Sequence, residues 1–150
     1  MKKTIIVHGG AWDIPKEIRK LCLEGVEKAT RLGINCLLRG GSALDAVATA
    51  VKEMEDNVVF DAGAGSVLNS EGKIELEAAI MDGESLKAGA VAAVRDIRNP
   101  ISLARKVMEN TDHVFLVGEG ANKFARSMNF RKFNGLVVKR ELERWKKLRN

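Results

Sequence analysis

Long apolar runs are missing from this 150-residue sequence. A membrane-spanning helix needs about 20 consecutive apolar residues, so we expect no transmembrane segment and no membrane partner. Near the N-terminus the apolar run extends only from Ile5 to Val7, which is too short for the core of a signal peptide. These absences lead us to expect a cytoplasmic protein.

Cysteine and histidine are scarce, with two of each. Cys22 and Cys36 fall on one predicted helix, where their separation corresponds to about 21 Å, too far for a disulfide. There is no Cys-x-x-Cys pair or Cys/His cluster, which argues against structural zinc. His8 and His113 lie within or beside apolar runs, and we interpret both as structural residues rather than general bases.

The common catalytic motifs are also missing. The sequence has no phosphate-binding P-loop, no Gly-x-Ser-x-Gly nucleophile elbow and no Gly-x-Gly-x-x-Gly dinucleotide motif, so no organic cofactor is expected. Acidic residues gather between positions 53 and 82, but their spacing matches no calcium loop. We expect most of them to face solvent: Glu53, Glu55, Asp56, Asp61, Glu75, Glu77 and Asp82.

Excess positive charge is confined to the C-terminal end. Residues 131–150 carry a net charge of +6, whereas residues 1–130 carry −1. A basic tail can bind nucleic acid or an acidic protein. However, Val138, Leu142, Trp145 and Leu148 form one apolar stripe, and aromatic residues are not interleaved as an RNA-binding surface requires. We therefore favour a solvated amphipathic helix and no nucleic-acid partner.

The remaining pattern predicts an α+β domain in which a sheet packs against helices. Buried strands are expected at 4–8, 88–94 and 113–118, and an alternating strand at 74–81. Predicted helices cover 15–38, 43–55, 100–109 and 119–128. Between them, residues 55–73 form a glycine-rich loop with a turn at "NSEG".

Several residues give these elements their ends and their packing. Asp13 before Pro15 predicts the start of the first helix, and Ser42 is expected to cap the second. Gly25 and Gly33 lie on the apolar side of the first helix, where we expect them to allow close packing.

Two glycine-rich loops, at 9–12 and 61–66, each adjoin a predicted strand end. Glycine lets the main chain approach a ligand closely and present N–H groups to an anion or oxyanion. Tight turns explain the same glycines equally well, so the pattern alone leaves both interpretations open.

Five sequence blocks occur in the order found in one enzyme family: "HGGAWDIP", "GGSALDAV", "FDAGAGSVLNSEGKIELEAAIMDG", "KAGAVAAVRDIRNPISLARKVME" and "HVFLVGEGANKFA". Through them the sequence resembles plant-type L-asparaginases and isoaspartyl peptidases, which are N-terminal-nucleophile hydrolases. The resemblance runs from about residue 4 to residue 128, and the tail from Phe130 matches nothing in the family.

Several expectations follow from this resemblance. Family members are precursors that cleave themselves once, and the new N-terminal threonine of the β fragment becomes the nucleophile. The α and β fragments share one αββα sandwich and pair as an (αβ)2 assembly. This chain resembles the α subunit: residues 1–129 would form half of the four-layer sandwich, and residues 130–150 the basic linker before the cleavage point. No catalytic residue is then expected in this chain, because the nucleophile would follow Asn150 on the separate β subunit.

The resemblance also implies specific site residues. Gly9 and Gly10 match a turn that approaches the active centre, with Trp12 packed over it. Asp61 occupies the position of an asparagine that organises polar contacts near the nucleophile, and Glu77 stands where an aspartate is usual. A loop that binds sodium through main-chain carbonyls corresponds here to Met54, Glu55, Asn57, Phe60, Ala62 and Ala64.

The implied activity is hydrolysis of the side-chain amide of L-asparagine or of β-aspartyl dipeptides. Two other hypotheses remain open at this point. Asp61 lacks the amide donor of asparagine, so the chain could belong to an inactive family member. Alternatively, the basic tail could make it a binding module for an acidic partner.

Overall fold

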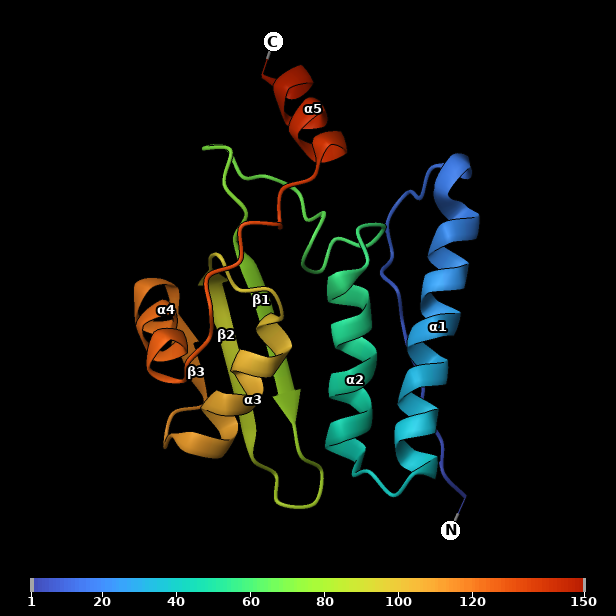
Figure 1. The fold of residues 1–150 in the computed structure, drawn as a ribbon, viewed down its shortest axis with the longest axis vertical. Helices are drawn as coiled ribbons and strands as arrows, with labels where there is room; N and C mark the ends of the chain where they lie inside the picture. The colour runs from blue at the N-terminus through green and yellow to red at the C-terminus, as the bar shows by residue number, and fades with distance from the viewer. Residues whose placement is uncertain (1, 150) are drawn as a thin grey trace.

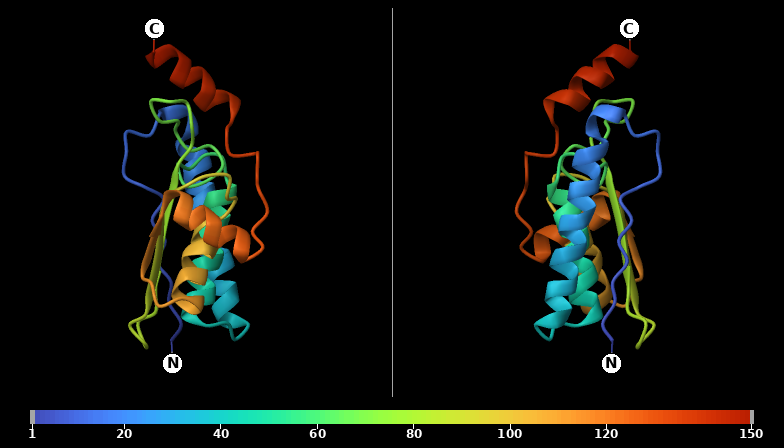
Figure 2. Two further views of the ribbon diagram at one scale, coloured as in Figure 1. Left: turned by 90° about the vertical axis from the view of Figure 1, so that its left-hand side faces the viewer. Right: turned by 90° about the vertical axis from the view of Figure 1, so that its right-hand side faces the viewer.

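The computed structural model describes residues 2–149. Over this range the chain forms a three-stranded sheet, one 3-10 turn and five α-helices. In chain order these are η1 (Lys16–Ile18), α1 (Arg19–Leu38), α2 (Ala43–Asp56), β1 (Leu76–Met81), β2 (Ala88–Val94), α3 (Pro100–Asn110), β3 (Phe115–Val117), α4 (Gly118–Ser127) and α5 (Lys139–Leu148). Figures 1 and 2 show α1 to α4 on one side of the sheet. The predicted α+β class is confirmed.

The helix starts agree only partly with the sequence signals. Ser42 caps α2 in a capping box, in which its side chain and that of Asp45 satisfy each other's backbone N–H groups. Hydrogen bonds from Ser42 and Arg105 lower the pKa of Asp45 to about 2. The prediction for Asp13 is wrong: Pro15 immediately precedes the 3-10 turn, and α1 follows from Arg19 without a side-chain cap.

The sheet has the order β1-β2-β3, with β1 and β2 antiparallel and β2 and β3 parallel. The strand predicted at 74–81 begins at Leu76, and its register shifts between Leu76 and Ala78. The strand predicted at 88–94 is confirmed. On the face covered by helices, Val91 and Val94 pack in one cluster with Leu103 and Val107 of α3. Burying these side chains supplies the main hydrophobic stabilisation.

A second, smaller cluster joins α1 to the loop after α2. Cys22, Val59 and Phe60 are buried together. Gly25 permits this contact, because a Cβ there would lie 2.7 Å from Phe60 Cε2. Gly33 likewise lies against Ile5 and the Ala46 carbonyl of α2. The predicted close-packing role of both glycines is confirmed, and both cysteines are free.

The strand predicted at 4–8 is wrong as a buried strand. Residues 4–8 are not assigned to a strand, and Ile6 is 90% exposed. Burial still alternates along this β-branched run: Ile5 and Val7 are partly buried, whereas Thr4, Ile6 and His8 are exposed. Figure 1 places this segment and β1 on opposite sides of α2. Within residues 2–149 the segment therefore has the pattern of a strand without a pairing neighbour.

The buried strand predicted at 113–118 also needs correction. β3 contains only Phe115–Val117, and the side chains of Phe115 and Val117 are 55% and 51% exposed. Apolar side chains continue across this side of the sheet, because Phe115 pairs with Ala90 and Val117 with Ala92. We call this surface the open face: Ala79, Met81, Ala90, Ala92, Phe115 and Val117. An apolar run indicates that both faces of a strand suit burial, but not which chain covers them.

The tail forms the predicted amphipathic helix as α5, but the helix is not simply solvated. Glu141 is buried, and the indole of Trp145 hydrogen-bonds to the Asn69 carbonyl oxygen at 2.8 Å. Among the described residues, no helix has the length and apolar character required to cross a membrane.

The contact between β2 and α3 yields a stability prediction. A Cβ at position 89 would overlap the Ala104 carbonyl oxygen and lie 2.5 Å from the Met108 nitrogen. Since both neighbours are backbone atoms, Gly89→Ala should lower the free energy of unfolding by about 1–3 kcal/mol. Urea denaturation measures the change.

Gly120→Ala provides the matched control, because nothing lies within 4 Å of a Cβ at that position in α4. It should raise stability by up to about 1 kcal/mol through helix propensity. Equal effects of the two substitutions would contradict the close contact between β2 and α3.

Candidate functional site

The first glycine-rich loop packs against the residue that immediately precedes the second. A Cβ at Gly9 would lie 2.5 Å from Val26 Cγ2 and 3.1 Å from Phe60 Cε1. Gly10 has φ +104°, a conformation that glycine adopts without strain. The Gly10 N–H donates to His8 Nδ1 at 3.2 Å, so His8 stabilises the turn as predicted. The chain thus brings its first glycine-rich loop against Phe60, directly before the second.

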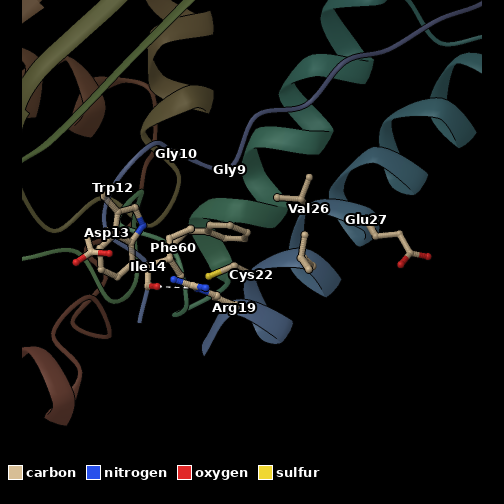
Figure 3. Close-up of a pocket in the computed structure, with 11 residues that line it drawn as sticks. Gly9, Gly10, Trp12, Asp13, Ile14, Arg19, Cys22, Val26, Glu27 and Phe60 are labelled. Carbon is tan, nitrogen blue, oxygen red and sulfur yellow. Dashed lines mark hydrogen bonds between the residues drawn. The ribbon is translucent and has the colours of Figure 1, made fainter. Parts of the chain in front are cut away.

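A cavity of about 730 Å³ opens beside this junction, between the N-terminal segment and α1. Figure 3 shows Trp12, Ile14, Phe60 and Cys22 around it. Gly9 and Gly10 line it as well, together with Asp13, Arg19, Leu23, Val26 and Glu27. The guanidinium of Arg19 is held at the rim by a 3.0 Å hydrogen bond from Nε to the Ile14 carbonyl oxygen.

The lining is mainly apolar, with main chain at one end and charged groups at the edge. Such an open, mainly apolar cavity can hold a small molecule or an inserted side chain. Sequence reasoning placed Trp12 and the two glycines here, but missed Arg19 and Phe60 as lining residues. The signal for Arg19 was the spacing on α1, where Arg19, Cys22 and Val26 share one face.

Asp61 is the third predicted lining residue, and it lies next to Phe60 but outside the cavity lining. Its Oδ1 accepts a hydrogen bond from the Val67 N–H at 2.9 Å. This bond closes the loop across residues 61–67. An asparagine carbonyl could accept the same bond, so the loop geometry does not depend on the charge of Asp61.

The carbonyl groups predicted to hold sodium lie in a tightly folded segment. The oxygens of Met54, Glu55 and Asn57 accept hydrogen bonds from the N–H groups of Asn57, Ala64 and Phe60 at 3.2, 2.9 and 3.1 Å. A Cβ at Gly63 would overlap the Glu55 carbonyl oxygen. The segment therefore curls around the end of α2, and each oxygen keeps a second lone pair. Among residues 2–149, no three His, Cys, Asp or Glu side chains converge to hold a metal ion.

The four threonines occupy structural positions. Thr30 and Thr111 donate their hydroxyl hydrogens to the carbonyl oxygens of Val26 and Val107, at 2.8 and 2.9 Å. Thr49 lies within α2, and Thr4 lies in the exposed N-terminal segment. None of the four lines the cavity beside Gly9.

Comparison with known proteins decides the family. The sequence matches the family described as asparaginase over residues 1–150. The chain belongs to this asparaginase family. The resemblance carried by the five sequence blocks is thereby confirmed. The expectation that the tail from Phe130 matches nothing in the family is wrong, because the match continues through the tail to residue 150.

This asparaginase-family chain is similar to curated proteins from distant organisms. It is 57% identical over 147 residues to a plant-type L-asparaginase of Pyrococcus horikoshii, a match covering 97% of this chain and 48% of the relative. It is 51% identical over 149 residues to an isoaspartyl peptidase/L-asparaginase of Danio rerio, covering 98% and 48%. The chain therefore spans about half the length of the curated relatives it matches.

The asparaginase-family chain also holds an acidic side chain whose role the sequence analysis missed. Glu55 was expected among solvent-facing acids, but it is 2% exposed. Its Oε1 accepts the Ile101 N–H at 2.8 Å in the first turn of α3. The helical periodicity indicated this burial, because Glu55 lies seven residues after Ala48 and four after Val51, which places it on the apolar face of α2.

Burial in an apolar surrounding raises the pKa of Glu55 from 4.5 to about 8, although the hydrogen bond from Ile101 opposes the shift. The other oxygen, Oε2, has no hydrogen-bond partner among the described residues. Glu55 therefore links α2 to the start of α3 through its side chain, and to Ala64 through its carbonyl oxygen.

The raised pKa predicts how stability depends on pH. Below about pH 4.5, Glu55 is protonated in both the folded and unfolded states, and its contribution is fully present. As pH rises from there through about 8, the unfolded chain releases a proton that the folded chain retains, so this stability is lost. Glu55→Gln cannot titrate, and should gain stability relative to the unmodified protein as pH increases from 5 to 8.5.

Thermal unfolding across this pH range measures the difference. Glu53→Gln is the control, because Glu53 lies two positions earlier on α2 and forms an ion pair with Lys28 instead. Parallel pH profiles for Glu55→Gln and the unmodified protein would contradict the assignment.

Proposed function

We propose that this chain is the α subunit of an amidohydrolase that cleaves the side-chain amide of L-asparagine or the isopeptide bond of β-aspartyl dipeptides. The observation that carries the proposal is the packing of the first glycine-rich loop against Phe60, the residue immediately before the second glycine-rich loop. The turn at Gly9 and Gly10 packs against Phe60, directly beside Asp61. Membership of the asparaginase family supports the reaction class.

In this proposal the chain supplies the wall of the active site and a partner supplies the nucleophile. A threonine at the N-terminus of the β subunit attacks the amide carbonyl, while its own amino group accepts the hydroxyl proton. Collapse of the tetrahedral intermediate forms an ester and releases ammonia, or an amino acid from a dipeptide. Water then hydrolyses the ester to release aspartate. The structural positions of Thr30 and Thr111 agree with a nucleophile located outside this chain.

The open face supports a partner built as a second sheet. Apolar surface on this scale is usually covered by protein, and two sheets pack face to face about 10 Å apart with side chains interdigitated. The small side chains of Ala79, Ala90 and Ala92, flanked by Met81 and Phe115, suit such packing. The result would be the αββα sandwich, which two αβ pairs then form as an (αβ)2 assembly.

The position of the N-terminal segment supports the same arrangement. Residues 4–8 alternate like a strand, and Figure 2 shows this segment on the same side of the helices as the sheet, although it is not paired with β1. Strands from the β subunit could pair with this segment and complete the sheet. Their first residue, the nucleophilic threonine, would then lie close to Gly9 and Gly10.

A sodium ion in the curled segment at the end of α2 is part of the proposal. Carbonyl oxygens suit a hard cation, and a second lone pair is free for it on Met54, Glu55 and Asn57. Phe60, Ala62 and Ala64 would provide the remaining oxygens. Bound there, the ion would fix the backbone that carries Asp61.

The activity is tested on the full-length protein. Release of aspartate from L-asparagine and from a β-aspartyl dipeptide should be observed, and intact-mass analysis should detect a second chain beginning with threonine. Replacing that threonine by alanine should abolish hydrolysis. A single uncleaved chain that hydrolyses neither substrate would contradict the proposal.

Substitution of Asp61 tests its place in the site and the hypothesis of an inactive member. Asp61→Ala removes the acceptor for the Val67 N–H, and should lower kcat/KM by about tenfold or more because the loop loses its geometry. Asp61→Asn keeps the acceptor and should remain within about threefold of the unmodified protein. Asp112→Ala, at an exposed carboxylate between α3 and β3, is the control.

Full activity of the Asp61→Ala variant would show that Asp61 is not part of the active site. A large gain of activity in Asp61→Asn would instead support the hypothesis that aspartate inactivates this family member.

A further inference from the structure

The C-terminal segment lies against the loop that carries Asp61. We call residues 57–73 the site loop. From here on, the tail means its contacting part, residues 134–149. In Figures 1 and 2, α5 stands at the end of the molecule where the site loop emerges. Three separate contacts join the tail to the site loop, and they reach both sides of Asp61.

The first contact is between main-chain atoms. The Gly65 N–H donates to the Leu136 carbonyl oxygen at 2.8 Å, and the Leu136 side chain is buried. Gly65 has φ +91°, and a Cβ there would lie 2.6 Å from the Val58 carbonyl oxygen. The tail is thus bonded to Gly65, which follows Asp61 in the chain. At this point Gly65 packs against Val58, which precedes Asp61.

The second contact reaches the segment before Asp61. Arg140 Nη2 donates to the Val58 carbonyl oxygen at 2.9 Å, and its Nε donates to Glu141 Oε1 at 2.7 Å. Glu141 is 5% exposed, and Arg144 lies 3.7 Å from its other oxygen. A buried carboxylate needs such paired cations, so Arg140 and Arg144 neutralise Glu141 within α5, and Arg140 also bonds the helix to the site loop.

The third contact fixes the far end of the site loop. Trp145 Nε1 donates to the Asn69 carbonyl oxygen at 2.8 Å. The indole ring covers Gly72, where a Cβ would lie 2.9 Å from Trp145 Cζ2. The guanidinium of Arg149 lies over the Trp145 ring, 4.9 Å from the ring centroid.

We propose that the tail is a strap that positions Asp61, with Arg140 and Trp145 as positioning residues for the reaction; this rests on the proposed function. Asp61 lies between Val58 and Gly65, and the tail bonds to both of these residues. The bond from the Val67 N–H to Asp61 closes the loop between these two anchored residues. When the contacts of the tail are lost, the segments on either side of Asp61 can separate, and Asp61 leaves the position that the reaction requires.

Hydrogen exchange tests the strap without relying on activity. In the full-length protein, Arg140→Gln and Trp145→Phe should increase amide exchange about tenfold in peptides covering residues 61–73, the effect of losing one stabilising hydrogen bond. Trp145→Phe keeps a ring over Gly72, so it isolates the N–H bond. Exchange in peptides covering α3 should stay unchanged, which excludes general unfolding.

Two controls change the same helix away from the site loop. Lys147→Gln removes a positive charge from an exposed position of α5, as a match for Arg140→Gln. Leu148→Ala truncates an exposed side chain of the same helix. Both should leave the exchange of residues 61–73 unchanged.

Kinetics test the positioning role. Arg140→Gln should lower kcat about tenfold with less than a twofold change in KM, since the strap acts on geometry rather than on substrate contacts. Arg140→Lys retains a donor for the Val58 carbonyl oxygen, and should recover at least half of the lost kcat. Unchanged exchange in both Arg140→Gln and Trp145→Phe overturns the strap, whatever the activity. If exchange rises as expected while the unmodified protein hydrolyses neither substrate, the proposed function fails instead and the positioning role fails with it.

Discussion

The packing of Phe60 against two glycines is the contact on which the site depends. Gly25 on α1 and Gly9 in the N-terminal segment have no side chain, so the Phe60 ring can lie against both. This single ring fixes α1, the first glycine-rich loop and the second relative to one another. Asp61 follows Phe60 directly, so its position is set by the same contact. Any side chain larger than hydrogen at either glycine would move the loops apart.

Periodicity in the sequence predicted the elements that are packed on this chain's own residues. α2, α3 and β2 appear where expected, because their apolar faces meet other parts of the same chain. The two failed strand predictions share a different cause. Residues 4–8 and 113–118 have apolar patterns suited to burial, but residues 2–149 provide no cover for Ile6 or Phe115. An apolar sequence pattern indicates that a surface suits burial, but it does not identify which chain covers that surface.

The candidate site shows the same division. The main-chain turn at Gly9 and Gly10 could be predicted, because glycine pairs have few other uses at the end of an extended segment. The buried carboxyl of Glu55 was missed because its charge argued for solvent, although its position on α2 argued for burial. The docking of the tail was missed because basic charge on α5 resembles a solvated face. In the structure, part of that charge neutralises Glu141.

The open face has a consequence for how the chain survives before it is covered. Phe115 and Val117 expose apolar side chains on an edge strand whose outer hydrogen-bonding side has no neighbour within residues 2–149. Such an edge can recruit strands from any nearby chain. In the assembly proposed above, this surface would be prone to aggregation until a second sheet covers it, and slow assembly would lower the yield of correctly formed molecules. The same alanine-rich surface that suits the chain to the proposed assembly would thus make it dependent on prompt assembly.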